Sequence, residues 1–202
     1  GTDKKDEILT LTAHYDSVPE GPGAYDNMAG AAIIMELCRY FQQYRPRRTM
    51  EFVWFGAEEK GLLGSRDYIR VHESELGAHR FNMNVDLAGQ LIGGNVLGVT
   101  GEASVCDKLL EIVDGAGIGA SVKNQIWGSD SNSFAWKGIP AMTLNRDGFG
   151  MHTRYDTIDL LSAWSLERSA ILLGCIADAL GNAEVFPFER KMPEKFIGEL
   201  DE

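Results

Sequence analysis

The feature that most constrains the fold of this chain is a regular alternation of short β-rich runs with longer amphipathic segments. Residues 8–13 form a run of aliphatic residues and threonine that stops at polar residues, a pattern typical of a buried strand. A loop containing Pro and Gly follows at residues 17–25, and apolar residues then recur at helical spacing: Ala31, Ile34, Met35, Cys38 and Phe41. Since parallel strands need long crossovers, the pattern predicts an α/β fold, with a twisted, mostly parallel sheet and helices on both faces.

The boundaries of the other elements follow from the same periodicities. We expect further strands at about residues 50–55, 81–87, 96–100 and 141–144, and further helices at about residues 62–74, 103–114, 134–138 and 162–180. The first helix can be capped by Asp26 or Asn27, and it ends before Pro46 because the residue before a proline avoids helical geometry. Residues 151–161 are expected to form a loop.

The chain has 202 residues, a length that suits a single domain. We expect this domain to span residues 1–202, with a core at about residues 8–181 and a polar tail at residues 182–202 that lies on the surface or frays. His72 and His79 flank a polar segment and are expected to lie on the surface.

The composition excludes several classes of partner. The chain has 30 Asp and Glu residues against 19 Lys and Arg residues, which gives a formal net charge of −11. Nucleic acids and anionic membranes bind basic faces, so we expect neither as a partner. No apolar run is long enough for a membrane span. The three cysteines lie far apart without a CxxC motif, which indicates neither a disulfide framework nor a cysteine zinc site.

Candidate metal ligands follow the predicted strands, at the edge where such sheets bind their ligands. They are His14 and Asp16 after the first strand, Asp26 at the start of the next helix, Glu58 and Glu59 after the second strand, Asp86 at the end of the third, and His152 after the strand at 141–144. Each alone has an ordinary explanation, such as a helix cap or a solvated acidic turn. Those explanations do not account for the convergence of all these residues on one edge, because crowded carboxylates repel one another unless a cation neutralises them. A set of histidines and carboxylates without cysteine suits Zn²⁺, with Mn²⁺ or Co²⁺ as substitutes.

Six segments carry a more specific signal. They are His14-Tyr15-Asp16-Ser17, Tyr25-Asp26-Asn27-Met28-Ala29-Gly30, Phe55-Gly56-Ala57-Glu58-Glu59-Lys60-Gly61-Leu62-Leu63-Gly64-Ser65, Asn84-Val85-Asp86-Leu87-Ala88-Gly89, Ser129-Asp130 and His152-Thr153-Arg154-Tyr155-Asp156-Thr157. In this order, from about residue 8 to residue 180, they resemble the co-catalytic dinuclear zinc aminopeptidases. That family also contains glutamate carboxypeptidase-like and glutaminyl-cyclase-like relatives.

The resemblance implies a zinc exopeptidase-like fold and a role for each ligand. Asp26 would bridge two zinc ions, with His14 and Asp86 completing one site and Glu59 and His152 the other. Glu58 would be the general base, activating a metal-bridging water that hydrolyses the N-terminal peptide bond of a peptide with a free N-terminus. Asp16 would orient His14, as metal-bound histidines usually require.

The resemblance also sets two expectations about the chain as a whole. Family domains usually carry an extra helix and strands before the strand that leads into His14. We expect these N-terminal elements to be missing and one sheet edge to be exposed. Many relatives are exported, which favours an extracytoplasmic or secreted location, although no signal peptide is visible in the sequence. The oligomeric state is left open.

A substrate pocket is expected beside the last histidine. Residues 146–151 are Gly-rich and adjoin a ligand, so we expect Phe149 and Met151 to receive the first side chain of the substrate, together with Trp127, Tyr155 and Asp130. Some family members use a tyrosine near the last histidine to stabilise the oxyanion. Met151 occupies the position before His152 here, which leaves Tyr25, Tyr155 or the metals for that task.

Three alternatives to an aminopeptidase stay open. A carboxypeptidase needs basic residues for the substrate carboxylate, and Arg146 and Arg154 flank His152. A cyclase of this family uses one zinc, so five retained ligands argue against it. A non-catalytic domain on the same fold would lose ligands or the base, and neither loss is visible in the sequence.

Overall fold

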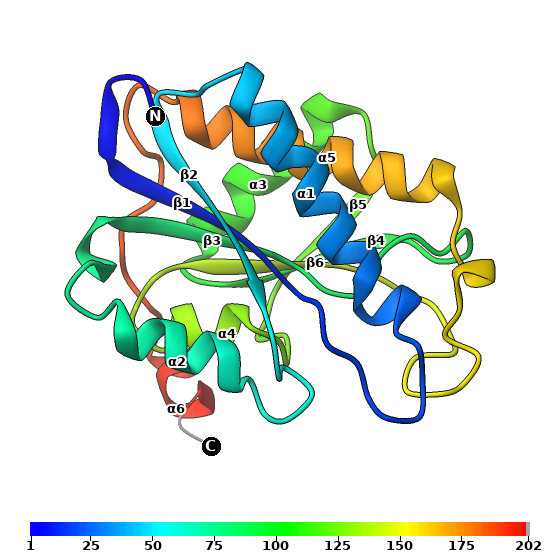
Figure 1. The fold of residues 1–202 in the computed structure, drawn as a ribbon. Coiled ribbons are helices and arrows are strands. Elements are labelled where there is room, and N and C mark those ends of the chain that lie inside the picture. The colour runs from blue at the N-terminus through cyan, green and yellow to red at the C-terminus, as the bar shows by residue number, and fades with distance from the viewer. Residues whose placement is uncertain (201–202) are drawn as a thin grey trace.

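A computed structural model describes residues 1–200, which form a mixed six-stranded sheet in the order β2-β1-β3-β6-β4-β5 (Figure 1). The strands are β1 (Lys4–His14), β2 (Arg48–Phe55), β3 (His79–Val85), β4 (Asn95–Thr100), β5 (Ala120–Asn124) and β6 (Ala141–Arg146). β1, β2, β3 and β6 run parallel, whereas β4 runs antiparallel to β6 and parallel to β5. The carboxyl ends of four neighbouring strands therefore meet at one edge of the sheet.

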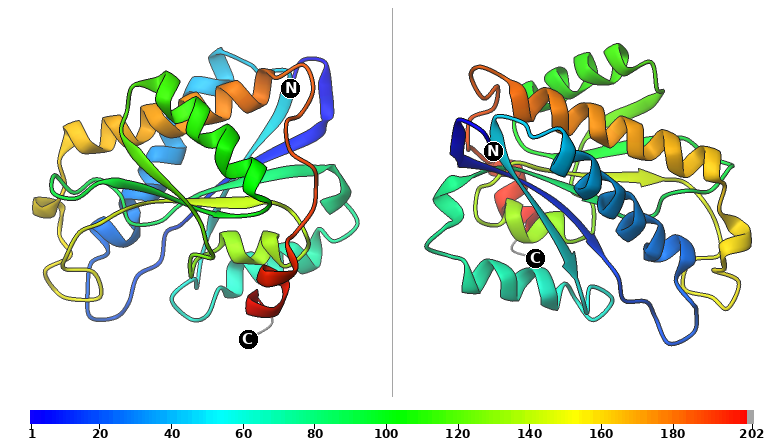
Figure 2. Two further views of the ribbon diagram at one scale, coloured as in Figure 1. Left: turned by 180° about the vertical axis from the view of Figure 1, so that it is seen from behind. Right: turned by 45° about the horizontal axis from the view of Figure 1, so that its top comes forward.

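Helices cover both faces of this sheet. One face carries α1 (Ala29–Gln43), α3 (Ala103–Ala116) and α5 (Ala163–Asn182), and the other carries α2 (Leu63–Val71), α4 (Ser131–Ala135) and α6 (Glu194–Leu200) (Figures 1 and 2). Shorter helical turns lie at Ala24–Met28, Leu76–Ala78 and Ile158–Leu160. Within the described part of the chain, no helix combines the length and apolar character that crossing a membrane requires.

The two faces of the sheet bury different kinds of side chain, because successive strand residues point to opposite sides. Aliphatic and aromatic residues of the central strands pack beneath α1, α3 and α5, among them Leu9, Leu11, Phe81, Met83, Met142 and Leu144. The alternate residues are polar but equally buried, among them Thr10, Thr12, Asn82, Asn84 and Thr143. Side-chain hydrogen bonds join Thr12 to Asn84, Asn84 to Ser129, and Ser131 to Thr143. The Thr10 hydroxyl and Asn82 Oδ1 are buried without a hydrogen-bond partner in residues 1–200. His14 continues this polar face at the end of β1.

The predicted α/β architecture is confirmed, with most element boundaries within a few residues. Three local predictions differ. Strand β5 was not expected, because it is a short edge strand without a fully buried residue. The helix expected at 134–138 lies instead at Ser131–Ala135, and Ile158–Leu160 forms a helical turn inside the expected loop. Of the two expected caps, Asn27 accepts a hydrogen bond from the Gly30 N–H at 3.1 Å.

The predictions for the tail and for the two remaining histidines hold in part. The tail lies largely at the surface, but it does not fray over the described residues, because the Phe188 ring packs 5.1 Å from the Phe81 ring, centroid to centroid, and α6 buries Phe196. His72 does lie at the surface, but His79 is only 1% exposed. Its Nε2 lies 3.0 Å from Glu51 Oε2, so it is a buried partner of a carboxylate rather than a surface histidine.

Candidate metal and active site

The five predicted ligands come together where β1, β2, β3 and β6 end. They form two groups, His14 with Asp26 and Asp86, and Asp26 with Glu59 and His152, and the ligand atoms of each group lie within 4.8 Å of one another. We call these five residues the ligand cluster. Its members come from segments that are distant in the sequence, and the parallel register of the strands places these segments side by side.

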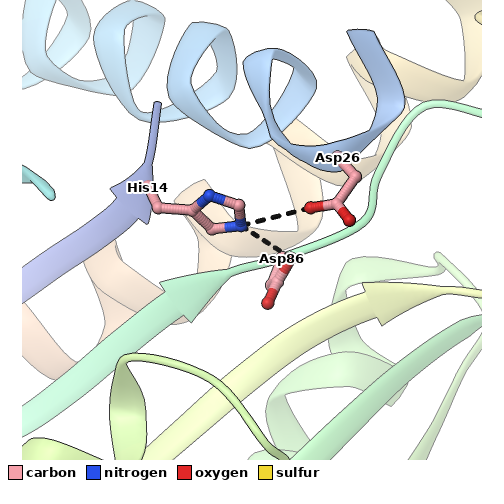
Figure 3. Close-up of side chains that lie close together, drawn as sticks. All are labelled: His14, Asp26 and Asp86. Carbon is pink, nitrogen blue, oxygen red and sulfur yellow. Dashed lines mark hydrogen bonds and ion pairs between the residues drawn. The ribbon is translucent and has the colours of Figure 1, made fainter. Parts of the chain in front are cut away.

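Asp26 belongs to both groups. His14 Nε2 lies 3.2 Å from Asp26 Oδ1 and 3.3 Å from Asp86 Oδ1, so the ring stands between two carboxylates (Figure 3). The other oxygen of Asp26, Oδ2, lies 3.0 Å from His152 Nε2, which is also 3.1 Å from Glu59 Oε2. Each oxygen of Asp26 therefore faces a different histidine, which is the geometry required of a carboxylate that bridges two cations.

The donor set fits divalent cations. Glu59 Oε1 is buried without a hydrogen-bond partner in the described part of the chain, whereas nearly all buried polar atoms have one. Three carboxylates and two imidazoles supply the mixed oxygen and nitrogen ligands that Zn²⁺ takes, and each group leaves coordination positions free, as catalytic zinc sites do. The ligand cluster is therefore a candidate site for divalent cations, with Asp26 common to its two groups.

The pKa values of His14 and Glu59 reflect the excess of carboxylates over positive charges in the ligand cluster. Burial by itself lowers the pKa of His14, but Asp26 and Asp86 outweigh this effect and raise that pKa to about 12. Burial raises the pKa of Glu59, and the neighbouring charge of Asp26 adds to the shift. Both changes favour bound protons in the metal-free protein, as expected where carboxylates outnumber positive charges.

Asp156, which sequence reasoning left without a role, holds the backbone around Asp26. Its carboxylate accepts hydrogen bonds from the backbone N–H groups of Tyr25, at 2.6 Å, and Asp26, at 3.1 Å. Because Asp156 follows His152 by four residues, it ties the loop of one ligand to the turn of another. The motif at residues 152–157 contains this aspartate, so a signal was present in the sequence without indicating its partner.

Asn27 fixes the other side of the same turn. Its Nδ2 donates to the carbonyl of Val85 at 2.7 Å, which connects the Asp26 turn to the residue before Asp86. Gly30 passes so close that a Cβ there would lie 2.4 Å from Asn27 Oδ1 and 2.8 Å from Val85 O. Only glycine fits this approach, which explains the glycine in the motif at residues 25–30.

Asp16 organises the turn that carries Glu58 and Glu59. Its two carboxylate oxygens accept hydrogen bonds from the backbone N–H groups of Glu58, at 3.1 Å, and Glu59, at 3.3 Å. The ring of His14 lies near the same residue, with Nδ1 3.2 Å from the Asp16 backbone carbonyl oxygen and 3.6 Å from the carboxylate. Asp16 is therefore placed to orient His14 mainly through its carbonyl and the glutamate turn through its side chain.

Glu58 belongs to neither ligand group but lies within electrostatic reach of them. Burial, reinforced by the charge of Asp86, raises the pKa of Glu58 to about 8. Two residues of the site also adopt left-handed backbone geometry, with φ of 57° at both Ala57 and His152. Such angles are uncommon for residues other than glycine and concentrate at functional sites.

The residues predicted for the substrate pocket differ widely in burial. The side chains of Phe149, Met151 and Tyr155 are exposed. Trp127 is half-buried and packs over Gly98 of β4, where a Cβ would lie 3.3 Å from the indole. Asp130 is fully buried, and burial raises its pKa to about 6. Their roles in substrate binding stay predictions.

The side chains of Tyr25 and Arg146, which were candidates for the oxyanion donor and the carboxylate receptor, already form hydrogen bonds within the protein. Tyr25 is buried, and its hydroxyl donates to the carbonyl of Arg146. The guanidinium of Arg146 is also buried and donates to Gln90 O at 2.6 Å, Leu91 O at 3.1 Å and Asn95 Oδ1 at 3.2 Å. Tyr25 as oxyanion donor and Arg146 as carboxylate receptor are therefore wrong. Tyr155 and Arg154 stay exposed, with Arg154 Nη2 donating to the Tyr155 hydroxyl at 2.7 Å.

The fold and the site define an α/β domain of the zinc-aminopeptidase type, and solved structures resemble it. BSAP, a zinc aminopeptidase from Bacillus subtilis, gives a TM-score of 0.80 at 26% identity, covering 95% of this chain and 51% of that one. A peptidase M28 precursor from Shewanella amazonensis gives a TM-score of 0.80 at 29% identity, covering 96% of this chain and 45% of that one.

Sequence comparison identifies the family. The model of peptidase family M28 matches residues 1–174, so the chain belongs to this family. Aminopeptidase YwaD of Bacillus subtilis is 30% identical over 161 residues, which are 79% of this chain and 32% of that protein. Carboxypeptidase Q of Rattus norvegicus is 25% identical over 191 residues, 91% of this chain and 40% of that protein. The chain thus spans about a third to two fifths of the length of these two curated relatives.

Proposed function

We propose that this protein is a zinc-dependent exopeptidase that removes the N-terminal residue of peptides. The observation that carries the proposal is the division of Asp26 between two histidines, with one carboxylate oxygen 3.2 Å from His14 Nε2 and the other 3.0 Å from His152 Nε2. This arrangement supports two Zn²⁺ ions held by the ligand cluster, with Mn²⁺ or Co²⁺ as substitutes. When bound, zinc polarises a carbonyl oxygen and lowers the pKa of water.

The chemistry of the chain's own residues centres on Glu58. We assign it the role of general base, which takes a proton from the attacking water and returns it to the leaving amine. Its burial, its exclusion from both ligand groups and the anchoring of its backbone N–H by Asp16 support this role. Adjacent residues on one turn thereby divide the work, Glu59 as a ligand and Glu58 as a proton carrier.

The choice of an aminopeptidase rests on the relatives that this chain matches. Two bound Zn²⁺ ions would offset the negative charges of Asp26, Asp86, Glu59 and Glu58, so the charge of the site does not by itself select the ammonium group of a free N-terminus. YwaD and BSAP are both named as aminopeptidases. The accessible aromatic and apolar side chains of Phe149 and Met151 would receive the first side chain of the peptide.

A carboxypeptidase is the second candidate. Carboxypeptidase Q is among the matched relatives, and Arg154 lies exposed two residues after His152. Arg146 cannot assist, since its guanidinium is buried and bonded. One exposed arginine, stacked over the Tyr155 ring at 4.9 Å, would have to bind the substrate carboxylate alone.

The test is a panel of aminoacyl chromogenic substrates with zinc added, run beside peptides blocked at either end. We expect cleavage that requires a free α-amine and tolerates a blocked C-terminus. Glu58→Gln should retain zinc and lose about a thousandfold in kcat, the scale of a lost general base. Equal cleavage of acetylated peptides would refute the aminopeptidase, and an active, zinc-loaded Glu58→Gln variant would remove Glu58 as the base.

A further inference from the structure

Gln90 occupies a position that the motif analysis did not single out. It follows the motif at residues 84–89, and only 1% of it is exposed. Its backbone carbonyl accepts hydrogen bonds from Arg146 Nε, at 2.6 Å, and from Ser165 Oγ, at 2.7 Å. Its backbone also forms an antiparallel bridge to Leu161. The backbone of Gln90 is therefore held by hydrogen bonds to the end of β6 and to the start of α5, which fixes the base of its side chain.

The amide of Gln90 pairs with both backbone groups of one residue in the predicted substrate pocket. Gln90 Nε2 donates to the carbonyl of Phe149 at 2.6 Å, and the Phe149 N–H donates to Gln90 Oε1 at 3.1 Å. A side-chain amide is the group that can offer a donor and an acceptor side by side in this way. The pair resembles one rung of a β-ladder in which a side chain replaces the partner strand.

The loop backbone approaches the Gln90 amide so closely that residue 148 has no room for a side chain. A Cβ at Gly148 would lie 2.5 Å from Gln90 Cδ and 2.6 Å from Oε1. On its far side, the loop is closed by the Thr153 hydroxyl, which donates to Gly150 O at 2.7 Å. Residues 148–150 are thus held from both ends, while the ring of Phe149 is left exposed at 59%.

We infer that Gln90 is a positioning residue that sets the shape of the substrate pocket by fixing the Phe149 backbone. A ring that stays exposed gains no order from packing, so its position depends on its backbone, and the Gln90 amide supplies the fixed point. His152 lies three residues further along the same loop. Gln90 therefore acts on substrate selection through Phe149, and it touches neither a ligand nor Glu58. The catalytic part of this inference rests on the proposed function, whereas the structural part does not.

The test compares Gln90→Met, which keeps the length and removes both hydrogen bonds, with Ser165→Ala, which removes a hydrogen bond to the Gln90 backbone and leaves the amide pair in place. Hydrogen exchange of the Phe149 amide is followed in metal-free and zinc-loaded protein. We expect faster exchange at Phe149 in Gln90→Met in both states and wild-type exchange in Ser165→Ala. Unchanged exchange in Gln90→Met would overturn the inference.

The second readout is selectivity. The ratio of kcat/KM for a leucyl and an alanyl substrate should fall about tenfold in Gln90→Met, the scale of lost fit in an apolar pocket, with zinc content unchanged. Gln90→Glu should share the loss, because its carboxylate cannot donate to the Phe149 carbonyl. An unchanged ratio in both variants would also overturn the inference. A wild-type protein that binds zinc and cleaves no substrate would refute the proposed function, and Phe149 exchange would then decide the role of Gln90.

Discussion

Within residues 1–200, two clusters that are at least partly buried combine histidine with carboxylate, and they differ in the balance of acidic groups and their partners. The ligand cluster places two histidines among three carboxylates at the carboxyl ends of the strands. The second cluster, which we call the Glu51 cluster, consists of Glu51, Tyr68 and His79 and lies between β2, β3 and α2. Glu51 Oε2 accepts from the Tyr68 hydroxyl at 2.7 Å and lies 3.0 Å from His79 Nε2. In the Glu51 cluster, one carboxylate therefore contacts two hydrogen-bonding partners.

The two clusters differ in how far their side chains satisfy one another. In the Glu51 cluster the side chains satisfy one another, and the hydrogen bonds to His79 and Tyr68 hold the pKa of Glu51 below its ordinary value although burial opposes this. In the ligand cluster the pKa of His14 and that of Glu59 are both raised, and Glu59 Oε1 has no hydrogen-bond partner in residues 1–200. An excess of acceptors over donors, rather than the presence of histidine and acid, is what indicates a cation site.

The largest effect should come from Asp26. Asp26→Ala removes the carboxylate shared by both groups, so we expect zinc affinity to fall more than about 100-fold. Competition with a chromophoric chelator measures it. Glu51→Gln, which removes a partly buried carboxylate charge from the other cluster, is the matched control and should bind zinc like the wild type. Two tightly bound ions in Asp26→Ala would contradict the bridging role.

Zinc should stabilise the protein through the ligand cluster alone. At free zinc of about 100 times the dissociation constant, we expect a gain of about 2.7 kcal/mol in the free energy of unfolding for each site. Urea unfolding with zinc and with chelator gives the difference. Glu51→Gln should show the same gain as the wild type, whereas Asp26→Ala should show little. An equal gain in Asp26→Ala would place the stabilising zinc elsewhere.

The Glu51 cluster should matter for stability and not for metal. Glu51→Gln replaces the charged acceptor that the buried His79 and the half-buried Tyr68 share, and we expect the free energy of unfolding to drop by about 1–3 kcal/mol. The control is Glu73→Gln, because Glu73 pairs with Lys137 on the surface and exposed pairs contribute about 0–1 kcal/mol. Equal losses of unfolding free energy in the two variants would show that the Glu51 cluster stabilises the fold no more than an exposed ion pair does.

The pH dependence of that loss should be the subtlest effect. Because the folded pKa of Glu51 is depressed, its ionised form stabilises the fold above the unfolded pKa of about 4.3, and the gain is lost as pH falls through the folded value. The stability difference between the wild type and Glu51→Gln should thus hold from pH 7 to about pH 5 and shrink below about pH 4. A difference that already vanishes at pH 6 would contradict the depressed pKa.

The same contrast shows what the sequence could predict. His14 stands at the end of a strand inside a recognisable motif, and the rule that ligands gather at the carboxyl ends of strands was enough to place it. His79 begins a strand, and its partner Glu51 lies two strands away in the sheet. Only the register of β1 with both neighbours brings them together, and a single sequence does not show that register.

The remaining omissions have the same physical origin. Phe188 and Phe196 are isolated aromatic residues in a polar tail, so no periodicity marks them as core, yet both fill space against the domain. Gln90 is a lone polar residue in a loop, and its partner Phe149 lies 59 positions away. Contacts that depend on one long-range pair leave no local pattern, whereas contacts repeated along a strand or helix do.

The central claim is that the ligand cluster holds two cations through Asp26. Its most direct test is the zinc content of the wild-type protein and of Asp26→Ala, measured by elemental analysis after dialysis against a stated free zinc concentration. We predict two zinc ions per chain in the wild type and a clear loss at the same free zinc in Asp26→Ala. A single ion per chain in the wild type, or the same zinc content in both proteins, would contradict it.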